Sequence, residues 1–443
     1  MLSRMLPARA FGARGFSALP KITTLSNGVR VATQQTKGPA ASVGVYVDVG
    51  VRDETPDMFG AGKLFEKVAL TGTKTRAGSK FASELESVGG VANVEVGRER
   101  TALQVSVPKG GEKKSLELIA DALLNGGADA KAVEAAADGE TGATIEDVIL
   151  DRLHQAAFRD CGLGNSIAVA EGTPSSIQAF QSMFCGSRSV VVAVGDVNHD
   201  EIVKTAESSL GKLAAGQGPV VPNTPYFLGS EMIYRNDDMG PTAYVGVGWP
   251  SVPYKSADSI AFGVMRATLG EFEKNSSIMP DKISGNRMIN AMANRMNVGC
   301  TDRYQTHLCQ YRDTGMLALV GACDEVAVRH MVLEFMFNTT MLAYSTQEEE
   351  IARGKRLFKG SLLAGQGSVA KRTDTIGTQL LAYGRVIPSE ELITRIDAVD
   401  RDEVRRVAWQ YIQDAEIVTT ALGPLHGMPH YYEVRKMTHW VRY

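Results

Sequence analysis

FGAGKLFEKVALTGT, residues 59–73, has the pattern of a short amphipathic helix. Its apolar residues recur at helical spacing and share one face: Ala61, Leu64, Phe65 and Val68. Glycines come just before the helix and Gly72 closes it, so we expect it to be bounded on both sides. The apolar face predicts burial against a core, which leaves the polar flank to carry any chemistry.

That polar flank carries Lys63, Glu66 and Lys67. Their spacing is that of an inverted zinc motif, His-x-x-Glu-His, in which two histidines bind the metal and the glutamate polarises a water molecule. Here lysine stands at both ligand positions, and an ammonium group has no lone pair to donate to a metal. The helix therefore belongs either to a metallopeptidase fold without its metal or to an unrelated protein.

Composition limits the class of protein. The chain has 443 residues, a formal net charge of −3 and 44% hydrophobic residues, which is typical of a soluble protein of two to four domains. This charge gives no general attraction to nucleic acid. The five cysteines are scattered without a C-x-x-C pair and predict reduced thiols. The only close histidine pair, His426 and His430, is separated by Gly and Pro and is interpreted as two loop residues.

Residues 1–20 are expected to be a mitochondrial transit peptide. They contain three arginines and two serines, and the first acidic residue of the chain is Asp48. An arginine-rich, acid-free segment without a continuous apolar core is typical of such peptides, and we expect cleavage after Phe16.

The remainder predicts two α+β domains of similar order, residues 21–212 and 229–443, joined by a linker at 213–228. In the first half VGVYVDVG precedes a helix, and in the second YVGVGWP does the same. SVVVAVGDV near the end of the first half likewise matches IVTTALGPL in the second. We expect each domain to hold an antiparallel sheet with helices packed on one face.

From Lys21 onward the chain resembles the pitrilysin-type metallopeptidase superfamily. Within it, the chain is similar to the β-subunit of mitochondrial processing peptidase and to core protein 1 of the cytochrome bc1 complex. The segments that carry the resemblance are TTLSNGVRVAT, VGVYVDVGVRDE, the helix described above, VGGVANVEVGRERT, CQYRDTGMLALVGAC, GTQLLAYGRVIPSEELITRIDAVDRDEV and LGPLHGMPHYYEVRK. The resemblance implies a two-domain chain that forms half of a bowl-shaped heterodimer.

The resemblance places the two zinc histidines on Lys63 and Lys67 and the general base on Glu66. The family's third ligand is a glutamate on a later helix, and either Glu134 or Glu140 matches it. Because both imidazoles are missing, we expect no bound metal or other cofactor, no catalytic residue, and a charge-compensating cluster around Glu66.

The function implied is that of a non-catalytic core subunit of ubiquinol–cytochrome c reductase, on the matrix side of the mitochondrial inner membrane. Its partners would be a core protein 2-like subunit, cytochrome b, cytochrome c1 and the Rieske subunit. The alternatives are a non-catalytic presequence-binding subunit of a processing peptidase and an active zinc metalloendopeptidase. Two further segments are candidates for contacts: Asn93–Arg100 for adding a peptide strand, and Tyr311–Asp313 for substrate or inter-domain contacts, with a structural salt bridge as the other interpretation.

Overall fold

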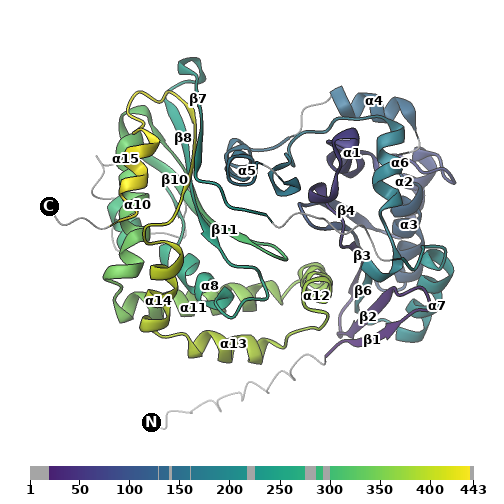
Figure 1. Ribbon diagram of the computed structural model, residues 1–443. Coiled ribbons are helices and arrows are strands. Elements are labelled where there is room, and N and C mark those ends of the chain that lie inside the picture. The colour runs from purple at the N-terminus through teal and green to yellow at the C-terminus, as the bar shows by residue number, and fades with distance from the viewer. Residues whose placement is uncertain are drawn as a thin grey trace, which may run out of the picture.

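The protein consists of two halves, each built on a six-stranded sheet (Figure 1). The computed structural model describes residues 19–127, 129–138, 142–159, 161–216, 225–274, 286–292 and 300–439. The predicted α+β class is confirmed, since strands and helices occur in both halves. The predicted domain limits of 212 and 229 remain a prediction.

The first sheet has the strand order β1-β2-β6-β3-β5-β4. The strands are β1 (Lys21–Thr24), β2 (Arg30–Gln35), β3 (Ala40–Val47), β4 (Val91–Val96), β5 (Thr101–Pro108) and β6 (Ser189–Gly195). All neighbouring strands are antiparallel except β2 and β6, which are parallel. The sheet is therefore mixed, and the expectation of a purely antiparallel sheet is corrected at this one pair.

The second sheet repeats this arrangement with the order β7-β12-β8-β11-β10-β9. The strands are β7 (Ser230–Arg235), β8 (Thr242–Ser251), β9 (Phe272–Glu273), β10 (Thr301–Gln310), β11 (Gly315–Asp324) and β12 (Val418–Gly423). Its one parallel pair, β7 and β12, corresponds to β2 and β6. The predicted matches of β3 with β8 and of β6 with β12 are confirmed, whereas β9 and β10 were not predicted.

Helices cover both sheets. In the first half they are α1 (Ala61–Val68), α2 (Gly78–Ser87), α3 (Glu112–Asn125), α4 (Ala130–Asp138), α5 (Ile145–Ala157), α6 (Pro174–Ser182) and α7 (His199–Leu210). In the second they are α8 (Ser259–Leu269), α9 (Arg287–Asn290), α10 (Val328–Tyr344), α11 (Glu348–Gly365), α12 (Val369–Tyr383), α13 (Ser389–Ala398), α14 (Arg401–Tyr411) and α15 (Tyr431–Lys436).

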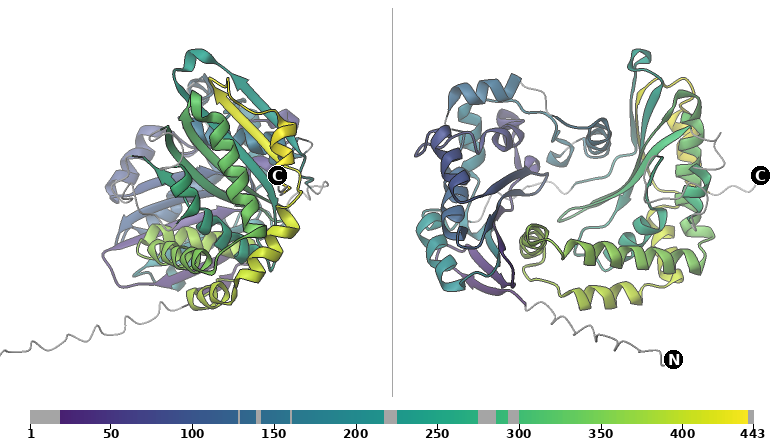
Figure 2. Two further views of the ribbon diagram at one scale, coloured as in Figure 1. Left: turned by 90° about the vertical axis from the view of Figure 1, so that its left-hand side faces the viewer. Right: turned by 180° about the vertical axis from the view of Figure 1, so that it is seen from behind.

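Each half gives one helix to the other. Helix α12 packs on β3 and β6 of the first sheet, and α5 packs on β8 and β12 of the second. Both helices lie between the two halves (Figure 1; Figure 2, right). Each sheet carries its own helices on its other face, such as α3 on the first and α10 on the second. The expectation of helices on one face is met by each sheet's own helices, and the other face is buried by a helix from the opposite half.

Glycines make room for the exchanged helices. A Cβ atom on Gly377 of α12 would lie 2.4 Å from the Tyr46 ring of β3. In the second sheet a Cβ atom on Gly246 of β8 would lie 2.7 Å from Ile149 of α5. Because the residues at these contacts are fully buried, the two halves share apolar cores that neither sheet could complete with its own helices alone.

Candidate functional site

Helix α1 is the predicted amphipathic helix, and its apolar face is buried as expected. Leu64, Phe65 and Val68 are fully buried, and the Phe65 ring lies 6.1 Å from that of Phe180 of α6. The residue before the helix, Gly60, has a φ angle of 78°, a left-handed conformation that glycine adopts without strain. The chain can therefore turn sharply into the helix and present its polar flank toward β4.

Glu54 caps the beginning of α1. Its carboxylate accepts hydrogen bonds from the backbone N–H groups of Gly60, at 2.9 Å, and Gly62, at 2.7 Å. A carboxylate is favoured at a helix N-terminus because of the unpaired N–H groups there. Burial of Glu54 nevertheless raises the pKa of its carboxyl from 4.5 to about 7, and the two N–H groups oppose this shift. Glu54 was not predicted as a site residue, although an acidic residue shortly before a Gly-x-Gly helix start is a signal that could have indicated a helix cap.

Both oxygens of Glu66 have partners. Oε1 lies 2.5 Å from the ammonium nitrogen of Lys63, and Oε2 accepts a hydrogen bond of 2.8 Å from the backbone N–H of Val96. The predicted Lys63–Glu66 pair is therefore present, with a further bond to the last residue of β4. Glu66 joins α1 to the edge strand of the first sheet.

Lys67 connects α1 to α4. Its ammonium group donates a hydrogen bond of 3.0 Å to the carbonyl of Ala136. Glu134, on the same helix, is exposed. Glu140, the other candidate for the distal position, lies outside the described residues. Across the described part of the chain, no group of three or more His, Cys, Asp or Glu side chains has the spacing of a metal site.

The Asn93–Arg100 segment lies at the edge of the first sheet and at the start of the neighbouring strand. Strand β4 pairs with β5 on one side only, so its other side is the sheet edge. On that edge the N–H of Val96 already donates a hydrogen bond to the carboxylate of Glu66, so this group is not free to pair with an added strand. Arg100 reaches across to the second half, where it lies 2.9 Å from Asp374 of α12.

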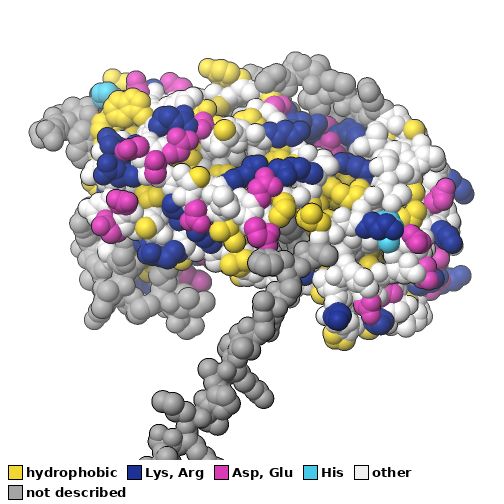
Figure 3. All heavy atoms as spheres, turned by 90° about the horizontal axis from the view of Figure 1, so that it is seen from below, with side chains coloured by type: hydrophobic (Ala, Val, Ile, Leu, Met, Phe, Trp, Pro, Cys, Tyr) yellow, Lys and Arg dark blue, Asp and Glu magenta, His cyan; other side chains and the backbone are white. Residues whose placement is uncertain are grey.

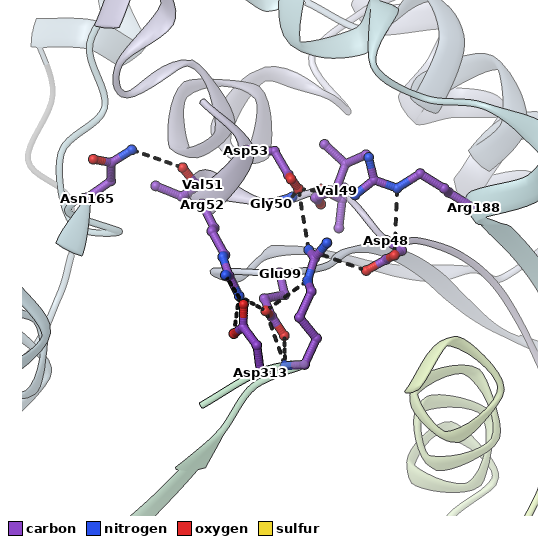
Figure 4. Close-up of polar contacts among 12 residues, drawn as sticks. Asp48, Val49, Gly50, Val51, Arg52, Asp53, Glu99, Asn165, Arg188 and Asp313 are labelled. Carbon is purple, nitrogen blue, oxygen red and sulfur yellow. Dashed lines mark hydrogen bonds and ion pairs between the residues drawn. The ribbon is translucent and has the colours of Figure 1, made fainter. Parts of the chain in front are cut away.

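Tyr311, Arg312 and Asp313 form the turn between β10 and β11, and all three contact the first half. Asp313 lies 2.5 Å from Arg52 (Figure 4), and Arg312 lies 3.0 Å from Glu99. Glu99 also pairs with Arg52 at 2.5 Å. These contacts favour the structural interpretation of the turn, because its charged groups are used to join the halves.

Tyr311 adds a buried hydrogen bond to this junction. Its hydroxyl lies 2.7 Å from Nε2 of His154 on α5, and Nδ1 of His154 lies 2.7 Å from the carbonyl of Leu150. Burial lowers the pKa of His154 well below its ordinary value. A neutral imidazole donating from one nitrogen and accepting at the other satisfies both contacts.

These observations define a class of protein: two α+β halves of like topology, each completed by a helix from the other. The chain belongs to peptidase family M16. The family model "Insulinase (Peptidase family M16)" matches residues 30–171, and "Peptidase M16 inactive domain" matches residues 175–358.

Similar proteins fall into two functional groups. The chain is 30% identical to a protein of Arabidopsis thaliana named "Probable mitochondrial-processing peptidase subunit beta", over 96% of this chain and 82% of that one. It is also 30% identical to the human "Cytochrome b-c1 complex subunit 1", over 96% of this chain and 90% of that one. A chain in the solved structure "Complex III2 from Candida albicans, Inz-5 bound" has the same fold, with a TM-score of 0.80 and 21% identity over 95% of this chain and all of that one.

Lys63, Glu66 and Lys67, which the resemblance places at the family's metal position, do not fit a zinc ion. Two positions offer ammonium groups, which are cationic and lack lone pairs. The remaining side chain, Glu66, uses one oxygen for Lys63 and the other for Val96. The arrangement can hold α1 against β4 and α4, and the residues that the structure describes around Glu66 include no set of ligands that could hold a metal-bound water.

Proposed function

We propose that the chain is a non-catalytic core subunit of mitochondrial ubiquinol–cytochrome c reductase, similar to core protein 1. The observation that carries this proposal is the full use of Glu66 by Lys63 and Val96 at the place of the family's zinc site. A subunit whose role is to support an assembly can do without a metal-activated water, whereas a peptidase of this family cannot.

The proposed partners are a core protein 2-like subunit, cytochrome b, cytochrome c1 and the Rieske subunit. No helix in the described part of the chain is long and apolar enough to cross a bilayer. We place the subunit on the matrix side of the inner membrane, held by those partners. The relatives named above, both of which are mitochondrial by name, support the mitochondrial part of this location.

A non-catalytic, presequence-binding subunit of a processing peptidase is the second candidate, since a relative named as a processing peptidase subunit beta is as similar to this chain as the human cytochrome b-c1 subunit is, at 30% identity. Binding of arginine-rich presequences would favour an acidic surface. Lys63 and Lys67 instead put positive charge on the polar flank of α1. The underside of the molecule also carries Lys and Arg side chains interspersed with Asp and Glu (Figure 3). The core-subunit role is therefore the better supported.

One experiment separates these candidates. Mitochondria are solubilised with a mild detergent, and the chain is followed by native electrophoresis together with b-type haem absorbance. Co-migration of the chain with haem is the expected result. A small haem-free heterodimer would contradict the core-subunit proposal.

The third candidate, an active zinc peptidase, is tested on the same purified material. We expect substoichiometric zinc and no presequence cleavage by the chain. Stoichiometric, chelator-sensitive zinc accompanied by cleavage would overturn the non-catalytic assignment, and the Glu66→Gln variant shows whether that cleavage depends on α1.

A further inference from the structure

Helix α11 has one buried face and one exposed face. The buried face packs on α8, where a Cβ atom on Gly354 would lie 2.3 Å from the hydroxyl of Thr268. The exposed face carries Arg356, Gly360 and Ala364, which are four residues apart and therefore lie in a row along the helix. Figure 1 shows α11 along the lower edge of the second half, beside α13.

Two leucines lie on either side of this row of small residues. Leu357 is 53% exposed and Leu363 is 52% exposed, although leucine is a residue that folding usually buries. A Cβ atom on Gly360 would meet no other part of the molecule within 4 Å, so the backbone between the leucines is accessible. A second helix can therefore approach α11 closely at Gly360 and contact a leucine on each side.

The same stretch is basic. Residues 351–373, which run from α11 into α12, contain six lysine or arginine residues and no aspartate or glutamate. Lys359 pairs with Asp397 of α13, and Lys355 donates to backbone carbonyls at the end of that helix. Arg356 is exposed, and among the residues that the structure describes it has no ion-pair partner. An arginine beside an apolar contact favours a carboxylate on the opposite side.

The chain itself does not supply that carboxylate from its undescribed segments of more than three residues. Segments 1–18, 293–299 and 440–443 are net positive, and 217–224 and 275–285 have a net charge of zero.

A second copy of the chain is also disfavoured. A two-fold contact repeats the same surface on both sides, so it would place this basic stretch against itself. The charge of the stretch therefore favours an acidic segment of a different polypeptide.

We propose that the exposed face of α11 binds an acidic α-helix of a partner polypeptide. That helix places small or apolar residues against Gly360 and its flanking leucines, and a carboxylate against Arg356. A lipid surface fits this face less well, because an interfacial helix has a continuous apolar face, whereas here small residues separate two leucines. Helix α11 has no part in the α1 site, so the inference goes beyond the function proposed above and does not depend on it.

Photo-cross-linking tests the proposal on the full chain in its native assembly, recovered through an affinity tag. A photoreactive amino acid replaces Leu363, and the cross-linked product is identified by mass spectrometry. The expected product is a peptide of another polypeptide, with a net negative charge. A phospholipid adduct, a peptide of this chain or the absence of any adduct would overturn the proposal.

Charge reversal tests the ion pair. Arg356→Glu should lower the yield of the cross-link about tenfold, because it replaces an attraction by like-charge repulsion. Arg405→Glu, at an exposed position of α14, makes the same change of charge elsewhere and should leave the yield unchanged. Equal losses from the two variants would contradict a specific contact at Arg356.

Graded substitutions at Gly360 separate binding from folding. Gly360→Leu fills the place where the partner approaches and should lower the cross-link about tenfold, with a smaller loss for Gly360→Ala. Both variants should stay folded, because a Cβ atom has open space there and both residues favour a helix over glycine. An undiminished cross-link from folded Gly360→Leu would contradict the proposal. The haem experiment described above does not involve α11, so the two proposals fail separately.

Discussion

Glu66 is the residue that the resemblance places at the family's general base. In the structure its carboxylate bonds Lys63 on its own helix and the N–H of Val96 on β4. Both partners lie at the boundary between α1 and the first sheet. The carboxylate is therefore expected to contribute to stability.

Glu66→Ala should lower the free energy of unfolding by about 1–3 kcal/mol, because it leaves the Val96 N–H without its acceptor. Chemical denaturation measures the change. Glu134→Ala, at the exposed candidate position on α4, is the control and should change stability by less than about 0.5 kcal/mol. A Glu66→Ala variant more stable than the parent would indicate that the residue is held for function at the expense of stability.

Glu54 makes stability depend on pH. Its pKa in the folded protein is raised from 4.5 to about 7 by burial, so the native state binds this proton more tightly than the unfolded chain. The stabilisation of the folded protein by this proton is fully present below pH 4.5 and is lost as the pH rises through about 7. Across this range the free energy of unfolding changes by about 3 kcal/mol.

The measurement compares the parent with Glu54→Gln by denaturation at several pH values. The parent should lose stability relative to the variant as the pH rises from about 4.5 to about 7. A difference between the two proteins that does not change over this window would show that the Glu54 carboxyl titrates at its ordinary value.

Helices α5 and α12 are the elements that make one molecule of two halves. Each leaves its own sheet and covers the inner face of the other. A glycine stands at each contact, Gly246 under α5 and Gly377 within α12. Close packing of this kind is intolerant of added volume, even where the backbone would accept a side chain.

Gly377→Ala should lower the free energy of unfolding by about 1–3 kcal/mol, since the new methyl group meets the Tyr46 ring. Gly360→Ala is the matched control, because it is also within a helix, α11, but has open space around its Cα. That substitution should stabilise by about 0.5–1 kcal/mol through helix propensity. Thermal unfolding measures the stability of both variants. If Gly377→Ala stabilised the protein as much as Gly360→Ala does, the tight contact between α12 and Tyr46 would be refuted.

The molecule as a whole is held by contacts that link residues hundreds of positions apart. The exchanged helices bury apolar side chains between the halves, and buried Arg52 pairs with both Glu99 and Asp313 beside them. A buried charge is costly when its partner is removed. The halves should therefore behave as one cooperative unit.

A protease site placed within residues 217–224 tests this cooperation. After cleavage we expect the two fragments to co-elute in native buffer and to separate only in denaturant. Residues 19–216 produced alone should aggregate, because α5 and the inner face of the first sheet would both be uncovered. Separation of the cleaved fragments under native conditions would show that the exchanged helices contribute little.

Much of the local structure could be predicted from the chain. The amphipathic pattern located α1, and strand patterns matched β3 to β8 and β6 to β12. Strand β10 was missed, because its exposed and half-buried residues do not form an apolar run. The parallel pairs were missed because pairing direction depends on how the chain crosses between strands.

The amino-acid sequence alone determined that α1 has the spacing of a zinc helix and that its two ligand positions hold lysine, since side-chain chemistry and helical periodicity are local properties. Folding decided what those residues contact. The bond from Glu66 to Val96, the cap formed by Glu54, and the exchange of α5 and α12 join groups that local sequence patterns do not connect. Such contacts follow from the packing of the two sheets, which local spacing does not specify.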